Sequence, residues 1–195
     1  MPAITERSTK TPLLKTRRMN HGTLHCRDIV KTRRFYEEVL GLDVIQPSPM
    51  SLMIRKGTDH VYAVVEMPNA PGGDMSMLNH NGFEVDSPEE VDAAYAQIMA
   101  IKDEWGLKKV MAPKTMHGDH AFYFMDFDGN WWEIVAVRQG GYVADFDDKE
   151  NWDLTGRHQA DGWVEKWVNE KKLMHLHDPE VRAEFREISG QAGSK

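Results

Sequence analysis

The chain of 195 residues lacks several features that define whole classes of protein. Cys26 is the only cysteine, so no disulfide can form within the chain, and a reducing compartment fits. No apolar run approaches the roughly 20 residues that a membrane-spanning helix needs. The N-terminus carries positive charges without the apolar segment of a signal peptide. We therefore expect a soluble, cytoplasmic protein that does not enter the membrane.

The chain also has no excess of positive charge, since its formal net charge is −7 at pH 7. This balance argues against an extended surface for nucleic acid. Basic residues do gather in residues 1–18, where apolar residues are few, and we interpret this segment as an N-terminal arm. The length and the ordinary apolar content fit one full-sized domain with an appendage.

The chain contains the same order of predicted elements twice, in residues 19–68 and in residues 78–137. In the first copy, a strand leads to a helix that Asp28 can cap and that Gly41 ends, and short strands follow. In the second copy, the helix after the strand begins with a capping box, Ser87-Pro88-Glu89-Glu90. Each copy is therefore a predicted βαβββ module.

The two copies also match in their residues. MNH at 19–21 corresponds to LNH at 78–80, and VVE at 64–66 corresponds to WWE at 131–133. Modules of this size are too small to be stable alone. We therefore expect an α+β fold in which the two paired modules form a half-open mixed β-barrel around a shared cavity, over residues 19–137.

Residues 138–195 differ in composition from the modules. An acidic, loop-like stretch comes first, Trp163 and Trp167 then lie four residues apart, and Asp178-Pro179-Glu180 can open a further helix. We predict a C-terminal helical extension packed on the domain. Alternatively, the extension covers the cavity or forms a subunit contact.

One carboxylate stands in an unusual place. Asp128-Gly129 joins two β-prone runs in a predicted hairpin, and Glu133 lies in the second run, flanked by tryptophan and aliphatic residues. Burying a lone carboxylate is costly, so Glu133 must reach solvent, a cation or a metal ion.

The repeat suggests partners for Glu133. It makes His21 equivalent to His80, and Glu66 equivalent to Glu133. Two histidines and one carboxylate on one face of a metal ion are typical of non-heme Fe(II) oxygenases. A single histidine is more often structural than a ligand, and His25 lies about 13 Å from His21 along a strand of normal rise. We therefore interpret His25 as structural, and His175 and His177 as surface residues.

Three segments resemble the vicinal oxygen chelate superfamily: MNHGTLHCRDIVKTRRFYEEVLGL, LNHNGFEVDSPEEVDAAY and FYFMDFDGNWWEI. That superfamily includes glyoxalase I, fosfomycin- and bleomycin-resistance proteins and type I extradiol dioxygenases. The resemblance covers about residues 19–137, and it implies a metal ion held by His21, His80 and Glu133. Phe127 is a departure, since the family usually has proline at this place in the turn.

Resemblance to the extradiol dioxygenases implies two further site residues. His60, on the last strand of the first module, corresponds to a proton shuttle, and Tyr123, ten residues before Glu133, to a group that binds a substrate oxygen. His117 or His120 corresponds less closely to a histidine near the oxygen site. A catechol must lose protons to chelate iron, and a histidine of near-neutral pKa can accept them.

Our first interpretation is an Fe²⁺-dependent extradiol-type dioxygenase, with Mn²⁺, Ni²⁺ and Zn²⁺ as alternative metals. It would act on a catecholic, vicinal-oxygen small-molecule substrate with O₂, and we expect a homo-oligomer without nucleic-acid or membrane partners. A second interpretation is a glyoxalase I-like isomerase or lyase. There Glu66 would be a fourth metal ligand, since His60, Tyr62, Val64 and Glu66 share parity on a strand. The third is a metal-free small-molecule binding or resistance protein.

Overall fold

The computed structural model describes residues 6–69, 74–116, 119–138, 140–149, 153 and 155–156. The helices predicted around Trp163, Trp167 and Asp178, and the candidate His117, lie outside these residues. Within the described part, no helix is both long and apolar enough to cross a membrane.

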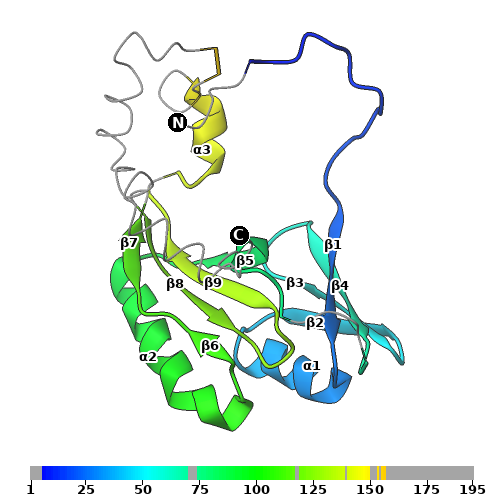
Figure 1. Ribbon diagram of the computed structural model, residues 1–195, viewed down its shortest axis with the longest axis vertical. Coiled ribbons are helices and arrows are strands. Elements are labelled where there is room, and N and C mark those ends of the chain that lie inside the picture. The colour runs from blue at the N-terminus through cyan, green and yellow to red at the C-terminus, as the bar shows by residue number, and fades with distance from the viewer. Residues whose placement is uncertain are drawn as a thin grey trace, which may run out of the picture.

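The first module forms a mixed sheet with one helix. Its elements are β1 (His21–Cys26), α1 (Ile29–Glu38), β2 (Asp43–Ser48), β3 (Ser51–Arg55) and β4 (Val61–Glu66). The strands lie in the order β1-β4-β3-β2, with β1 parallel to β4 and the other pairs antiparallel (Figure 1). The Asp28 carboxylate caps α1 by accepting hydrogen bonds from two N–H groups of its first turn, as the sequence predicts.

The second module repeats this plan after a short 3₁₀ helix, η1 (Met77–Asn79). Its strands lie in the order β5-β9-β8-β6, β7 pairs with β8, and β5 is parallel to β9. The predicted capping box is present in a modified form. Ser87 accepts from the N–H of Glu90, and the Glu90 carboxylate accepts from the N–H of Asp86, the residue before the N-cap. The bounds are β5 (His80–Glu84), α2 (Pro88–Trp105), β6 (Lys109–Val110), β7 (Lys114–Met116), β8 (Asp119–Met125) and β9 (Trp131–Ala136).

Aromatic side chains from both modules share one core. The Phe35 ring lies 5.4 Å from the Trp105 ring, and the Tyr36 ring lies 5.6 Å from the Trp132 ring. These contacts join α1 to α2 and to β9, so the helix-facing sides of the two sheets meet in the interior. The opposite faces of the sheets are left for a site.

The turn between β8 and β9 ties the second module to the start of α1. Asp128 is buried, and its carboxylate accepts hydrogen bonds from the N–H of Arg27 at 2.8 Å and the hydroxyl of Thr32 at 2.7 Å. The Arg27 guanidinium donates to the carbonyl oxygens of Phe127 and Asp128. This turn therefore fixes how the two modules sit against each other.

The predicted α+β fold of two βαβββ modules is confirmed, and each described sheet stays open instead of closing on itself. Beyond β9, the described part of the extension contains one short helix, α3 (Val143–Asp147). The predicted domain boundaries at residues 18 and 138 stay predictions.

Candidate metal centre

Three neighbouring strands of the second module bring the candidate residues together. Strand β9 lies between β5 and β8. Its residue Glu133 pairs with Gly82 on β5 and with Tyr123 on β8. Residues that pair across a sheet share a face, and so do residues two apart on one strand. His80, Glu133 and Tyr123 therefore project from the same face. Gly82 leaves room there, because a Cβ at this position would lie 3.0 Å from Glu133 Oε2.

His80 and Glu133 form a pair of donor atoms suited to a cation. His80 Nδ1 lies 2.7 Å from the carbonyl oxygen of Met77, which can only accept, so Nδ1 carries the proton. His80 Nε2 then faces Glu133 Oε2 at 3.4 Å. Two ligands bound at about 2.1 Å to one ion lie roughly 3.0–3.4 Å apart, so this pair fits a divalent metal.

The electrostatics of the pair agree with a cation site. Glu133 is 7% exposed although it carries a carboxylate. A hydrogen bond to Glu133 raises the pKa of His80 above its ordinary value, and burial opposes the rise. Without a metal, the carboxylate thus draws a proton onto Nε2, the atom that a metal would occupy.

Tyr123 lies beside both predicted ligands. Its ring meets the ring of His80 edge-on at 5.0 Å. Burial raises the pKa of Tyr123, and its hydrogen bond to the Glu133 carboxylate raises it further. The phenol therefore stays protonated at neutral pH and remains a hydrogen-bond donor at the site.

His21 lies on the other sheet, as the first residue of β1. Its side chain is exposed, and Nδ1 lies 3.0 Å from the amide oxygen of Asn20. Among the residues that the structure describes, no three His, Cys, Asp or Glu side chains form a metal-binding group. One chain therefore assembles His80 with Glu133, and the role of His21 stays a prediction.

The strand register argues against the second interpretation, in which Glu66 is a fourth ligand. Glu133 lies opposite Gly82, two residues after His80, whereas the residue two after His21 is Thr23, which lies opposite Ala63. Ala63 thus occupies the place equivalent to Glu133, and the match of VVE with WWE is displaced by three residues.

Glu66 has a structural role at the far end of the strand pair. It lies opposite Cys26, on the face that is buried against the helices, and its Oε1 accepts the N–H of Ile29 at 2.9 Å. Tyr62, Val64 and Glu66 do project from one face of β4, as the sequence predicts. This face is the core side of the sheet, and His21 projects from the opposite face.

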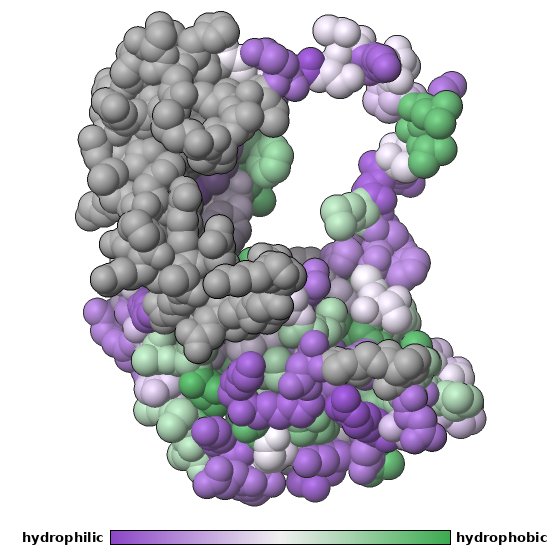
Figure 2. Space-filling model, viewed as in Figure 1, coloured by the Kyte–Doolittle hydropathy of each residue, from purple (hydrophilic) through white to green (hydrophobic). Residues whose placement is uncertain are grey.

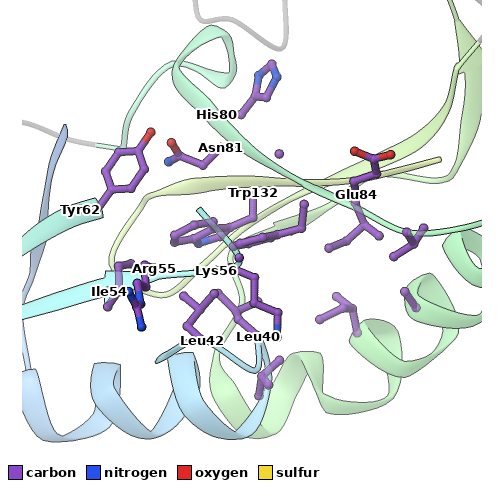
Figure 3. Close-up of a pocket in the computed structure, with 18 of the residues that line it drawn as sticks. Leu40, Leu42, Ile54, Arg55, Lys56, Tyr62, His80, Asn81, Glu84 and Trp132 are labelled. Carbon is purple, nitrogen blue, oxygen red and sulfur yellow. The ribbon is translucent and has the colours of Figure 1, made fainter. Parts of the chain in front are cut away.

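His60 immediately precedes β4 and borders a cavity of about 1080 Å³ between the modules. Its ring meets that of Tyr62 at 5.2 Å. The cavity also reaches His80 and Asn81, and Figure 3 shows the side chains of Tyr62 and Asn81 at one end and those of Leu40 and Leu42 at the other. His60 lies in this cavity's lining, and its catalytic role stays a prediction.

His120, the weaker candidate, has other partners. Its Nε2 lies 2.9 Å from Asp92 of α2, and its Nδ1 lies 2.9 Å from the Thr115 hydroxyl of β7. These contacts link the helix to the hairpin.

Sequence reasoning missed residues that follow β9. Arg138 binds Asp119 and Asp145, and its guanidinium lies 5.4 Å from the Tyr142 ring. Burial raises the pKa of Tyr142, and the carboxylates of Asp119 and Glu133 add to the rise. Tyr142 therefore lies within electrostatic reach of Glu133. The sequence carries no signal for this, because Tyr142 lies outside the repeated pattern.

Comparisons with known proteins agree with this geometry. A family model described as the Glyoxalase/Bleomycin resistance protein/Dioxygenase superfamily matches residues 18–134. The chain belongs to this superfamily. No curated protein matches it. The superfamily includes enzymes and proteins that bind divalent metals, and one FosX structure contains Mn(II) and sulfate.

Solved structures of superfamily proteins are similar at low identity. The fosfomycin resistance protein FosX from Listeria monocytogenes is 22% identical with a TM-score of 0.51, over 64% of this chain and 96% of that one. A glyoxalase/dioxygenase from Nostoc punctiforme is 19% identical with a TM-score of 0.50, over 68% and 100%. Lactoylglutathione lyase from Agrobacterium tumefaciens is 18% identical with a TM-score of 0.49, over 66% and 100%. The FosX and Nostoc proteins carry names of different activities, so their likeness to this chain shows the fold and not the reaction.

Proposed function

We propose that the chain is an Fe²⁺-dependent, extradiol-type ring-cleaving dioxygenase that acts on a catecholic substrate with O₂. The observation that carries the proposal is the donor set. His80 Nε2 and Glu133 Oε2 face each other at 3.4 Å, and Ala63 stands where a second carboxylate would be needed as a fourth ligand. Two histidines and one carboxylate leave three positions of an octahedral ion open, enough for two substrate oxygens and O₂. Bound Fe²⁺ would supply the electron transfer that activates O₂.

We propose that His21 comes to the site from a second copy of the chain. In the described sheets, β1 pairs only with β4, and β5 pairs only with β9, so each strand leaves one edge open. Both open strands begin with a candidate histidine. Unpaired edges are templates for strand pairing, and homo-oligomers commonly close by a two-fold axis. Pairing of β1 with β5 of the other copy would bring His21 to His80 and Glu133.

The remaining groups would act on the substrate directly. Tyr123 keeps its hydroxyl proton because of burial and the neighbouring carboxylate, so it would donate a hydrogen bond to a substrate oxygen. The Met77 carbonyl would hold His80 in the tautomer that presents Nε2. His60 would accept the proton that the catechol loses, since it borders the cavity that reaches His80 and Asn81.

The test is anaerobic reconstitution with Fe²⁺, addition of a panel of catechols, and admission of air. We expect O₂ uptake together with a yellow ring-cleaved product, a loss of bound iron in Glu133→Gln, and unchanged iron in Glu66→Gln. The second variant is a matched carboxylate control. Iron that binds without O₂ uptake on any catechol would contradict the oxygenase, and ligand binding that survives the loss of metal would favour a metal-free binding protein.

A further inference from the structure

The described part of the N-terminal arm, residues 6–18, and the two residues that lead from it into β1 run without helix or strand and expose large apolar side chains. Leu13 is 95% exposed, Leu14 is 71% exposed and Met19 is 85% exposed. Figure 1 shows the arm leaving β1, and Figure 2 shows open space between the arm and the sheets. Three exposed apolar residues within seven positions offer apolar surface that a partner would bury.

The arm is held at both of its described ends. It continues directly into β1 at His21, and Arg7 forms an ion pair with Asp153 at 2.5 Å. The exposed middle is therefore presented to the outside next to the open edge of β1. Continuity with that edge points to the same partner, a second copy of the chain.

Charge complementarity supports this partner. Residues 1–18 contain five basic side chains and one acidic one, so the arm carries +4, and a total of −7 leaves −11 on the rest of the chain. Lys15 and Arg17 form no ion pair within the described residues, and neither do the exposed Glu84 and Asp86 at the end of β5. Opposite charges are thus unpaired beside both open edges.

The shared metal fixes how these charges would meet. Suppose that β1 runs antiparallel to β5 of the other copy, with His21 beside His80. Each residue before His21 then pairs with the residue that lies equally far after His80. Residue 17 then falls beside residue 84, and residue 15 beside residue 86. Residues 15 and 17 share the parity of His21, as residues 84 and 86 share that of His80, so paired side chains project from one face.

We propose that residues 13–19 clasp a second copy of this chain, with Arg17 against Glu84 and Lys15 against Asp86 of that copy. Leu13, Leu14 and Met19 are covered when the clasp closes. Residues 13–17, which include both basic residues of the clasp, lie outside the matched superfamily region of residues 18–134. The inference rests on the second copy invoked for the proposed function.

Sedimentation equilibrium of the full chain at low salt tests the clasp by charge reversal. Lys15→Glu with Arg17→Glu should weaken self-association by roughly tenfold, because two favourable pairs become repulsive. Adding Glu84→Lys and Asp86→Lys to that variant should restore wild-type association. As a control, Lys102→Glu with Lys109→Glu makes the same charge change near β6, at the sheet edge opposite β5, and should leave association unchanged.

Each outcome bears on the proposal. Restoration by the second pair of substitutions upholds the clasp, and a reversal without effect, or one that is not restored, overturns it. A wild-type chain that is monomeric at every concentration overturns the clasp and the shared metal site together. A wild-type oligomer that never takes up O₂ removes the proposed dioxygenase and leaves the clasp standing, so the two failures are distinguishable.

Discussion

At the scale of single residues, the buried carboxylate of Asp126 is held by four hydrogen bonds. Its two oxygens accept hydrogen bonds from the N–H groups of Asp128 and Asn130, from the Asn130 amide and from the Trp132 indole. All of these partners are donors. Burial nevertheless raises the pKa of Asp126 to about 6, more than the hydrogen bonds lower it.

We expect Asp126→Asn to lower the free energy of unfolding by about 2–4 kcal/mol, since an amide NH₂ must then face a donor. Urea denaturation measures the loss, with the exposed Asp59→Asn as a control. The folded pKa is raised, so the wild-type contribution is present in full at low pH and falls as pH rises from about 4 to about 6. The difference between wild type and variant should therefore narrow over this window. A difference that widens with pH, or a loss below about 0.5 kcal/mol, would contradict the account.

At the scale of elements, strand β5 presents different side chains on its two faces. His80 and Gly82 share the face of Glu133, whereas Asn81 and Phe83 project to the other side, where Phe83 stacks on Trp132 at 5.4 Å. The absent side chain of Gly82 is what admits the Glu133 carboxylate beside His80.

Gly82→Ala should weaken Fe²⁺ binding about tenfold with little change in stability. The new Cβ would lie 3.0 Å from Glu133 Oε2, so the carboxylate must shift by a few tenths of an ångström. Competition with a chromophoric chelator measures the affinity. Asn81→Ala, on the other face of the same strand, is the control and should keep wild-type affinity. If both variants lost the same Fe²⁺ affinity, the cause would be a disrupted β5 strand and not a displaced Glu133 carboxylate.

The sequence was sufficient to predict α1, α2 and most strands, because caps and periodicity are local, but it did not predict η1 or the short strand β7. Asp28 and the Ser87 box place the starts of both helices correctly. The strand register was not predictable, since it depends on which backbone groups pair. The sequence around Glu66 resembles the sequence around Glu133. In the strand register, however, Ala63 occupies the position equivalent to Glu133, and Glu66 lies three residues further along the strand. The Met77 carbonyl that orients His80 likewise has no signature, because every residue carries a carbonyl.

At the scale of the whole molecule, a metal ion whose ligands come from two copies couples binding to association. A ligand that binds only the folded assembly stabilises it by RT ln(1 + [L]/Kd), about 2.7 kcal/mol at a hundredfold excess over Kd. Protein concentration enters the same equilibrium, because the proposed assembly contains two chains.

We expect Fe²⁺ or Mn²⁺ at a hundredfold excess over Kd to raise the Tm by about 5–10 °C, and dilution of the protein to reduce this gain. Differential scanning calorimetry at several protein concentrations gives both quantities. Glu133→Gln should abolish the metal-dependent shift, and a chelator should reverse it in the wild type. A metal-dependent shift that is independent of protein concentration would mean that one chain holds the ion alone.

The bonds from Asp128 to Arg27 and Thr32 also set the timing of folding during synthesis. The two ends of the Thr32 bond are 96 residues apart in the chain. At about 5–20 residues per second, a ribosome adds the second end roughly 5–20 s after the first. Until then the N–H of Arg27 and the hydroxyl of Thr32 lack the carboxylate that accepts from them, and the first module waits for the second before either can reach its final packing.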